Sequence, residues 1–133
     1  MTRHVAIFAC LALAGCVTAP AAKSQVVELG AEVTLAAGAT VSVKGAGLAV
    51  RFVSVTEDSR CPRDVTCIWA GEVKIQLEVL VSRTRSKVEI LEGGNTVASG
   101  YRVSLVRVDP VPSSTARIAL QDYRVTLRAD KAG

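Results

Sequence analysis

The sequence predicts an all-β fold in which two small antiparallel sheets pack face to face. Half of the 133 residues are hydrophobic but only 4% are aromatic, so the core must consist of Val, Leu, Ile and Ala. This β-branched bias favours strands over helices. Apolar and polar residues alternate from Val26 onward, and no stretch there has a convincing helical period. The length is typical of one domain.

The clearest strand is predicted at residues 72–81, where every second residue from Val73 to Val81 is apolar. Residues 82–86 would turn the chain, and residues 87–91 could pair back antiparallel. The other predicted strands are residues 26–29, 32–35, 40–43, 48–56, 101–108 and 117–128. Seven to eight short strands separated by turns indicate a β-sandwich with immunoglobulin-like or Greek-key connections.

Irregular positions are also predicted. The alternation slips by one residue at Phe52–Val53 and again at Leu105–Val106, which indicates β-bulges. Residues 92–100 contain Gly93-Gly94-Asn95, a strong turn signal, and residues 109–114 form a Pro-rich connection.

Residues 1–15 are predicted to be a lipoprotein signal peptide. Arg3 and His4 precede ten apolar residues, a run too short for a membrane span, which needs about 20. The next residues, Leu13-Ala14-Gly15-Cys16, resemble a bacterial lipobox. That resemblance implies cleavage before Cys16 and attachment of acyl chains, such as palmitate, to this residue. The alternative is an ordinary secretory signal in which Cys16 is incidental.

The lipobox resemblance implies a location at the cell envelope, with the membrane as a partner through the lipid on Cys16. Several acyl chains on one residue would anchor the protein stably. Val17 follows Cys16 in place of the Asp that resembles an inner-membrane retention signal, so the outer membrane is implied if the host has one. Residues 16–25 would be the lipidated Cys and a tether, and residues 26–133 a single β domain.

Residues 58–72, DSRCPRDVTCIWAGE, stand out from the alternating pattern. Cys61 and Cys67 are the only cysteines left beyond Cys16, and an exported chain usually pairs such residues. Zinc and a redox-active pair are weaker alternatives, because closed zinc sites need four ligands and redox pairs usually have Cys-x-x-Cys spacing. No metal or other cofactor is predicted.

Trp69 and the loop charges each have two interpretations. Trp69 either packs in the core beside the disulfide, which we favour, or is exposed as an anchor for a partner. The side chains of Asp58, Arg60, Arg63 and Asp64 either brace the loop, which we favour, or face a ligand.

The run DSRCP-x-D-V-x-C-x-WAG, preceded by Val-Thr-Glu, resembles the motif of a family of small exported bacterial lipoproteins of uncharacterised function. The similarity extends over most of the domain, including the Pro-containing residues 109–112 and the strand near Tyr123. It implies a lipoprotein and marks Cys61, Cys67 and Trp69 as motif positions. It implies no activity.

The sequence argues against enzymatic activity and nucleic-acid binding. No His follows His4, which excludes Ser-His-Asp and Cys-His catalysis, and no phosphate-binding Gly loop is present. The net charge of +4 falls to +3 once Arg3 is removed, which is mild for a nucleic-acid binder. Arg83, Arg85 and Lys87 would share a face if extended, and could contact anionic lipid or polysaccharide. The alternative is a solvated hairpin end.

We therefore expect a non-enzymatic binding or structural module of the envelope. Its candidate contacts are Arg63, Asp64 and Trp69 on the disulfide loop. One alternative is an inhibitor that presents this loop to a hydrolase, since a pre-organised loop suits that role. Another is a binder of anionic envelope glycan through Arg83, Arg85 and Lys87.

Overall fold

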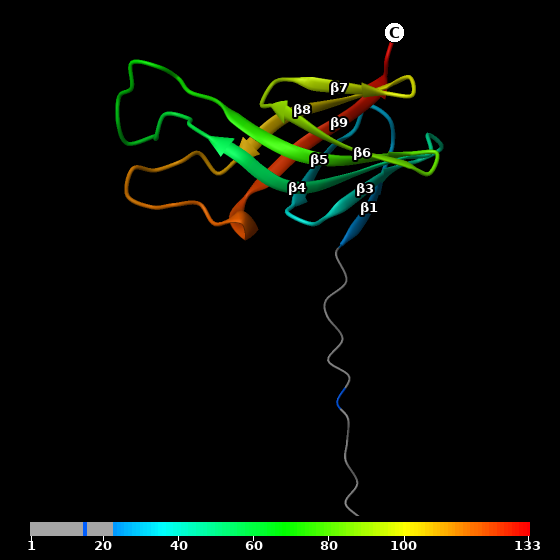
Figure 1. Cartoon of the computed structure of the whole chain (residues 1–133), viewed down its shortest axis with the longest axis horizontal. Helices are drawn as coiled ribbons and strands as arrows, with labels where there is room; N and C mark the ends of the chain where they lie inside the picture. The colour runs from blue at the N-terminus through cyan, green and yellow to red at the C-terminus, as the bar shows by residue number, and fades with distance from the viewer. Residues whose placement is uncertain (1–14, 16–22) are drawn as a thin grey trace, which may run out of the picture.

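A computed structural model of the protein describes Gly15 and residues 23–133. Two sheets pack face to face in this part of the chain, which confirms the predicted small β-sandwich (Figure 1). The spatial order of the five-stranded sheet is β1 (Ser24–Val27), β3 (Thr40–Val43), β4 (Leu48–Asp58), β5 (Val73–Val81) and β6 (Thr84–Leu91). The spatial order of the four-stranded sheet is β2 (Glu32–Ala36), β9 (Arg124–Lys131), β8 (Tyr101–Asp109) and β7 (Asn95–Ala98).

The core lies between the two sheets and is made of aliphatic side chains with the aromatic rings of Phe52 and Tyr123. Burial alternates strictly along β5: every second residue from Val73 to Val81 is buried, and the four residues between them, which include Leu80, are partly exposed. Phe52 in β4 is fully buried among them. Leu35 from β2 and Val125 from β9 are equally buried on the opposing sheet, so both sheets build the core.

Two bulges occur where the sequence predicts them. The pairing of β4 with β5 shifts register between Phe52 and Ser54, and the pairing of β8 with β9 shifts between Leu105 and Arg107. Each shift lets the strand return its apolar residues to the core after one extra residue, because the side chains of a strand alternate between its faces.

The predicted last strand, residues 117–128, is wrong in its bounds. Strand β9 begins at Arg124, after a short 3-10 turn at Leu120–Asp122. Arg124 is the last position with partners on both sides, Ala36 in β2 and Asp109 in β8. No neighbouring strand continues past this point, so residues 117–123 lie outside the sheet, as a loop that contains the 3-10 turn.

Three other boundaries differ from the prediction. Strand β7 lies inside residues 92–100, which were expected to be a turn, and it pairs with β8 across Ser99 and Gly100. Strand β6 begins at Thr84, because the turn before it is only Ser82 and Arg83. Strand β1 includes Ser24 and Gln25, which the sequence assigned to the tether, and pairs in parallel with β3. Residues 1–14, Cys16 and residues 17–22 lie outside the described residues.

Candidate functional site

The loop of residues 59–72 joins β4 to β5 and extends beyond the sheets at one end of the sandwich (Figure 1). The connection of residues 110–123, between β8 and β9, lies at the same end. The two segments touch, because the Arg63 amide donates a 3.0 Å hydrogen bond to the Pro112 carbonyl. We call residues 59–72 the motif loop.

The base of the motif loop continues the β4–β5 pairing past the ends of both strands. The Ser59 amide donates to the Glu72 carbonyl at 2.8 Å, and the Cys61 amide donates to the Ala70 carbonyl at 3.0 Å. Gly71 has a φ of 67°, and a Cβ atom at this position would collide with the Ser59 carbonyl. The close approach of the two loop arms therefore requires Gly71.

The disulfide predicted from the sequence is confirmed. Cys61 and Cys67 are bonded, with their Cα atoms 5.8 Å apart, so a ring of few residues closes just above the hydrogen-bonded base. Such a cross-link limits the conformations of the unfolded chain more than those of the folded loop.

Replacing both Cys61 and Cys67 with Ser should lower the free energy of unfolding by about 2 kcal/mol, because the loop-closure constraint on the unfolded chain is lost. The measurement is urea denaturation followed by circular dichroism. The matched control is the double variant Ser113→Ala/Thr115→Ala, which removes an exposed hydroxyl pair from the neighbouring connection. Equal stability of the oxidised wild type and the double Cys variant would contradict the prediction.

A largely buried cluster of Asp58, Arg60 and Tyr123 braces the loop. The Arg60 guanidinium binds the Asp58 carboxylate through two hydrogen bonds of 2.8 and 2.7 Å, and the Tyr123 hydroxyl donates to the same carboxylate at 2.8 Å. The Asp58 and Arg60 side chains are each only 11% exposed. Arg60 also donates to the carbonyls of Val108 and Pro110, so one guanidinium joins the motif loop to β8 and the connection after it.

This cluster changes the protonation behaviour of its members. Burial alone would raise the pKa of Asp58, but the hydrogen bonds from Arg60 and Tyr123, with the Arg60 charge, hold the pKa below its ordinary value. Burial, followed by the hydrogen bond to Asp58, raises the pKa of Tyr123 to about 12. At neutral pH the cluster therefore contains a carboxylate, a guanidinium and a neutral phenol.

The charged residues singled out at and beside the motif loop divide between the two roles considered from the sequence. Asp58 and Arg60 brace the loop, and Asp64 accepts hydrogen bonds from the Ser114 amide and hydroxyl. Those bonds lower the pKa of the Asp64 carboxyl. Arg63 is exposed, and its side chain makes no ion pair within residues 23–133. Of the predicted contacts on this loop, Arg63 is thus available to a partner, whereas Asp64 already has one.

The tip of the motif loop exposes apolar side chains. Ile68 is 93% exposed and Trp69 is 82% exposed, and Val65, three residues before Ile68, is 46% exposed. The prediction that Trp69 packs in the core is wrong, because the core ends where β4 and β5 end and the loop continues beyond it. Ile68 was not among the contacts predicted from the sequence. Its position next to Trp69, outside any alternating segment, was the available signal.

The structure separates Arg83, Arg85 and Lys87 from the motif loop, and it separates Arg83 from the other two. Arg85 and Lys87 lie on the outer face of β6, whereas Arg83 is in the two-residue turn with a φ of 72°. The expected stripe of three is therefore a pair. The β5–β6 turn lies at the opposite end of β5 from the motif loop, so the predicted contacts belong to two separate surfaces.

Comparison of the chain with protein-family models, curated proteins and solved structures gave no match. Within the described residues, no helix is both long and apolar enough to cross a membrane. The same part of the chain contains no group of three or more His, Cys, Asp or Glu side chains placed to hold a metal ion.

Proposed function

We propose that this protein is a non-enzymatic binding module of the bacterial envelope, tethered through lipid on Cys16, whose motif loop binds another protein. The observation that carries the proposal is the exposure of Ile68 and Trp69 on a loop that is fixed from below. When a partner buries these two large apolar side chains, binding is stabilised by about 25 cal/mol for each Å² of apolar surface removed from water.

The fixed backbone favours binding through this loop. A disulfide, the backbone pairs at the loop base and the Asp58–Arg60 ion pair hold the tip in one arrangement before any partner arrives. A pre-organised loop loses little conformational entropy on binding. Trp is also among the residues most enriched in the energetic centres of protein interfaces.

Inhibition of a hydrolase is a second candidate for the same loop. The observation that favours it is that the stapled tip extends beyond the sheets, a shape suited to entering a cleft (Figure 1). An inhibitor would abolish the activity of the enzyme it binds, whereas an assembly partner would bind without changing activity. An activity assay on the captured partner therefore separates the two candidates.

Trp69→Ala should weaken partner binding by at least about 30-fold, since interface centres contribute 2 kcal/mol or more. The measurement is affinity capture from envelope extracts with the disulfide-intact protein, followed by titration of the captured partner. Trp69 is exposed, so the variant should unfold at the same urea concentration as the wild type.

Val97→Ala is the matched control for capture, because Val97 is an exposed apolar residue on β7 of the other sheet. Unchanged capture by Trp69→Ala, or equal loss with Val97→Ala, would rule out the motif loop as the binding site.

The lipid tether has its own test. Cells expressing the wild type should incorporate labelled palmitate into this protein, and Cys16→Ser should abolish that incorporation and release the protein from the membrane fraction. Cys10→Ser is the matched control, because Cys10 lies within the predicted signal. Labelling that persists in Cys16→Ser would contradict the lipobox assignment.

A further inference from the structure

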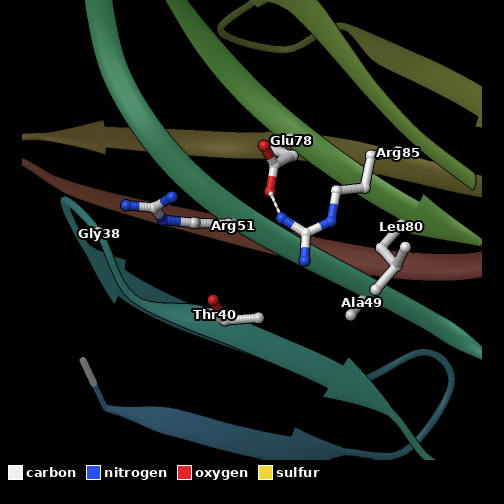
Figure 2. A pocket seen from close by; sticks show the side chains of 7 residues that line it. All are labelled: Gly38, Thr40, Ala49, Arg51, Glu78, Leu80 and Arg85. Carbon is white, nitrogen blue, oxygen red and sulfur yellow. Dashed lines mark hydrogen bonds and ion pairs between the residues drawn. The ribbon is translucent and has the colours of Figure 1, made fainter. Parts of the chain in front are cut away.

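A hollow lies on the outer face of the five-stranded sheet, away from the core. Its volume is about 280 Å³, and its lining comes from β3, β4, β5 and β6, with one residue from the turn before β3 (Figure 2). The lining residues are Gly38, Thr40, Ala49, Arg51, Glu78, Leu80 and Arg85. One sheet face forms the whole lining, so the hollow is open to solvent on the other side.

The pairing register explains this arrangement. Thr40 in β3 lies opposite Arg51 in β4, Arg51 lies opposite Glu78 in β5, and Glu78 lies opposite Lys87 in β6. These residues form one row that points away from the core. The adjacent row on the same face consists of Ser42, Ala49, Leu80 and Arg85. The small side chains of Thr40 and Ala49 form the bottom of the hollow, and the longer side chains of Arg51, Glu78 and Arg85 surround it.

The hollow carries a net positive charge, because its lining contains two Arg side chains and one Glu. Glu78 is the one carboxylate of the lining, and Arg85 binds it at 3.4 Å by leaning across from β6 (Figure 2). Arg51, the second Arg of the lining, forms no ion pair within residues 23–133. The Arg85 side chain remains 69% exposed, so its guanidinium retains donors for another acceptor.

We propose that this hollow binds one acidic sugar unit of an anionic saccharide. An Arg guanidinium matches a carboxylate or phosphate through two parallel hydrogen bonds. The Thr40 hydroxyl can bond a sugar hydroxyl, and Leu80 with Ala49 offers an apolar patch to the C–H face of the ring. The volume is below the roughly 300–1,000 Å³ of enclosed small-molecule sites. A site of this size and openness suits one unit of a longer chain.

Isothermal titration calorimetry on the purified protein at low salt tests the proposal with three probes. Trigalacturonate carries carboxylates, glucose 6-phosphate carries a phosphate, and maltotriose is neutral. Saturable binding of either acidic probe, without binding of maltotriose, supports the proposal, and the probe that binds identifies the acid. Failure of both acidic probes to bind overturns it.

The variants locate the site. Arg51→Gln and Arg85→Gln should each weaken binding about tenfold, since charge-assisted hydrogen bonds are lost. Thr40→Val should weaken it severalfold with no change in charge. Arg102→Gln makes the same charge change on β8 of the other sheet and should have no effect. An effect of Arg102→Gln equal to that of Arg51→Gln would show diffuse attraction and overturn the proposal.

This site does not depend on the motif loop. Trp69→Ala should leave saccharide binding unchanged, whereas Arg51→Gln should leave protein capture unchanged. Each proposal can therefore fail without the other.

Discussion

Replacing Asp58 with Asn is expected to lower the free energy of unfolding by about 3 kcal/mol. The Asp58 carboxylate accepts two hydrogen bonds from the Arg60 side chain and one from the Tyr123 hydroxyl. An amide of the same shape carries no charge, and its NH₂ group cannot accept a hydrogen bond. Arg60 would then remain largely buried beside a neutral group, and breaking a buried ion pair from one side is costly. Urea denaturation measures the change.

The pH dependence of stability follows from the direction of the Asp58 shift. The folded-state pKa is lower than the ordinary value of 3.8, so the contribution of Asp58 is fully present above that value. Stability is lost as the pH falls through the lower, folded-state pKa, because protonation removes the ion pair with Arg60. The stability difference between wild type and Asp58→Asn should therefore shrink as the pH is lowered from 5 toward 2.

Asp130→Asn is the matched control for this prediction. Asp130 also binds an Arg two residues away in the sequence, Arg128, at 2.9 Å, but its side chain is 35% exposed. Exposed pairs contribute about 0.2–1 kcal/mol, so the control should be close to wild type. Equal losses in Asp58→Asn and Asp130→Asn would show that burial of the Asp58–Arg60 pair does not matter.

Gly71→Ala is expected to destabilise the protein by about 3 kcal/mol. Ala at this position would have to adopt the φ of 67°, which costs an L-residue about 1–2 kcal/mol. Its Cβ would also collide with backbone atoms of Ser59 and Arg60. Those atoms cannot easily retreat, because the Ser59 and Cys61 amides hydrogen-bond across the loop base. The measurements are urea denaturation and hydrogen exchange of the Cys61 amide, which should become faster.

Gly100→Ala separates the two causes. Gly100 has a φ of 82°, but nothing lies within 4 Å of its added Cβ. The free energy of unfolding of this variant should fall only by the conformational cost of about 1 kcal/mol. If Gly71→Ala and Gly100→Ala are equally destabilised, the close approach between the arms of the motif loop does not contribute to stability.

The sandwich could be predicted because its strands obey the two-residue period. In β5, every second residue from Val73 to Val81 is apolar and buried, and even the bulges at Phe52 and Leu105 appear as phase slips in the sequence. The bounds of β9 could not be predicted, because the alternation in residues 117–123 has no neighbouring strand to pair with. Pairing partners are a property of the fold, and the local pattern does not contain them.

The candidate sites show the same division. The cysteine count indicated the Cys61–Cys67 disulfide. The prediction that Trp69 is buried was wrong, because the sequence of a loop without strand alternation does not show which side chains point inward. Arg51 was not singled out from the sequence. Its neighbours in the hollow, Glu78 and Arg85, lie 27 or more positions later in the sequence and are brought together only by strand register.

The pairing of β2 with β9 delays completion of the four-stranded sheet until the end of the chain has been synthesised. Strand β2 pairs with β9 alone among the described strands, and Thr34 and Thr126 in that pair are 92 residues apart. At 5–20 residues per second, a ribosome needs about 5–20 s to make the residues between them. The four-stranded sheet cannot close during that interval. If residues 1–15 direct export, the export machinery can engage the chain before it holds a finished fold.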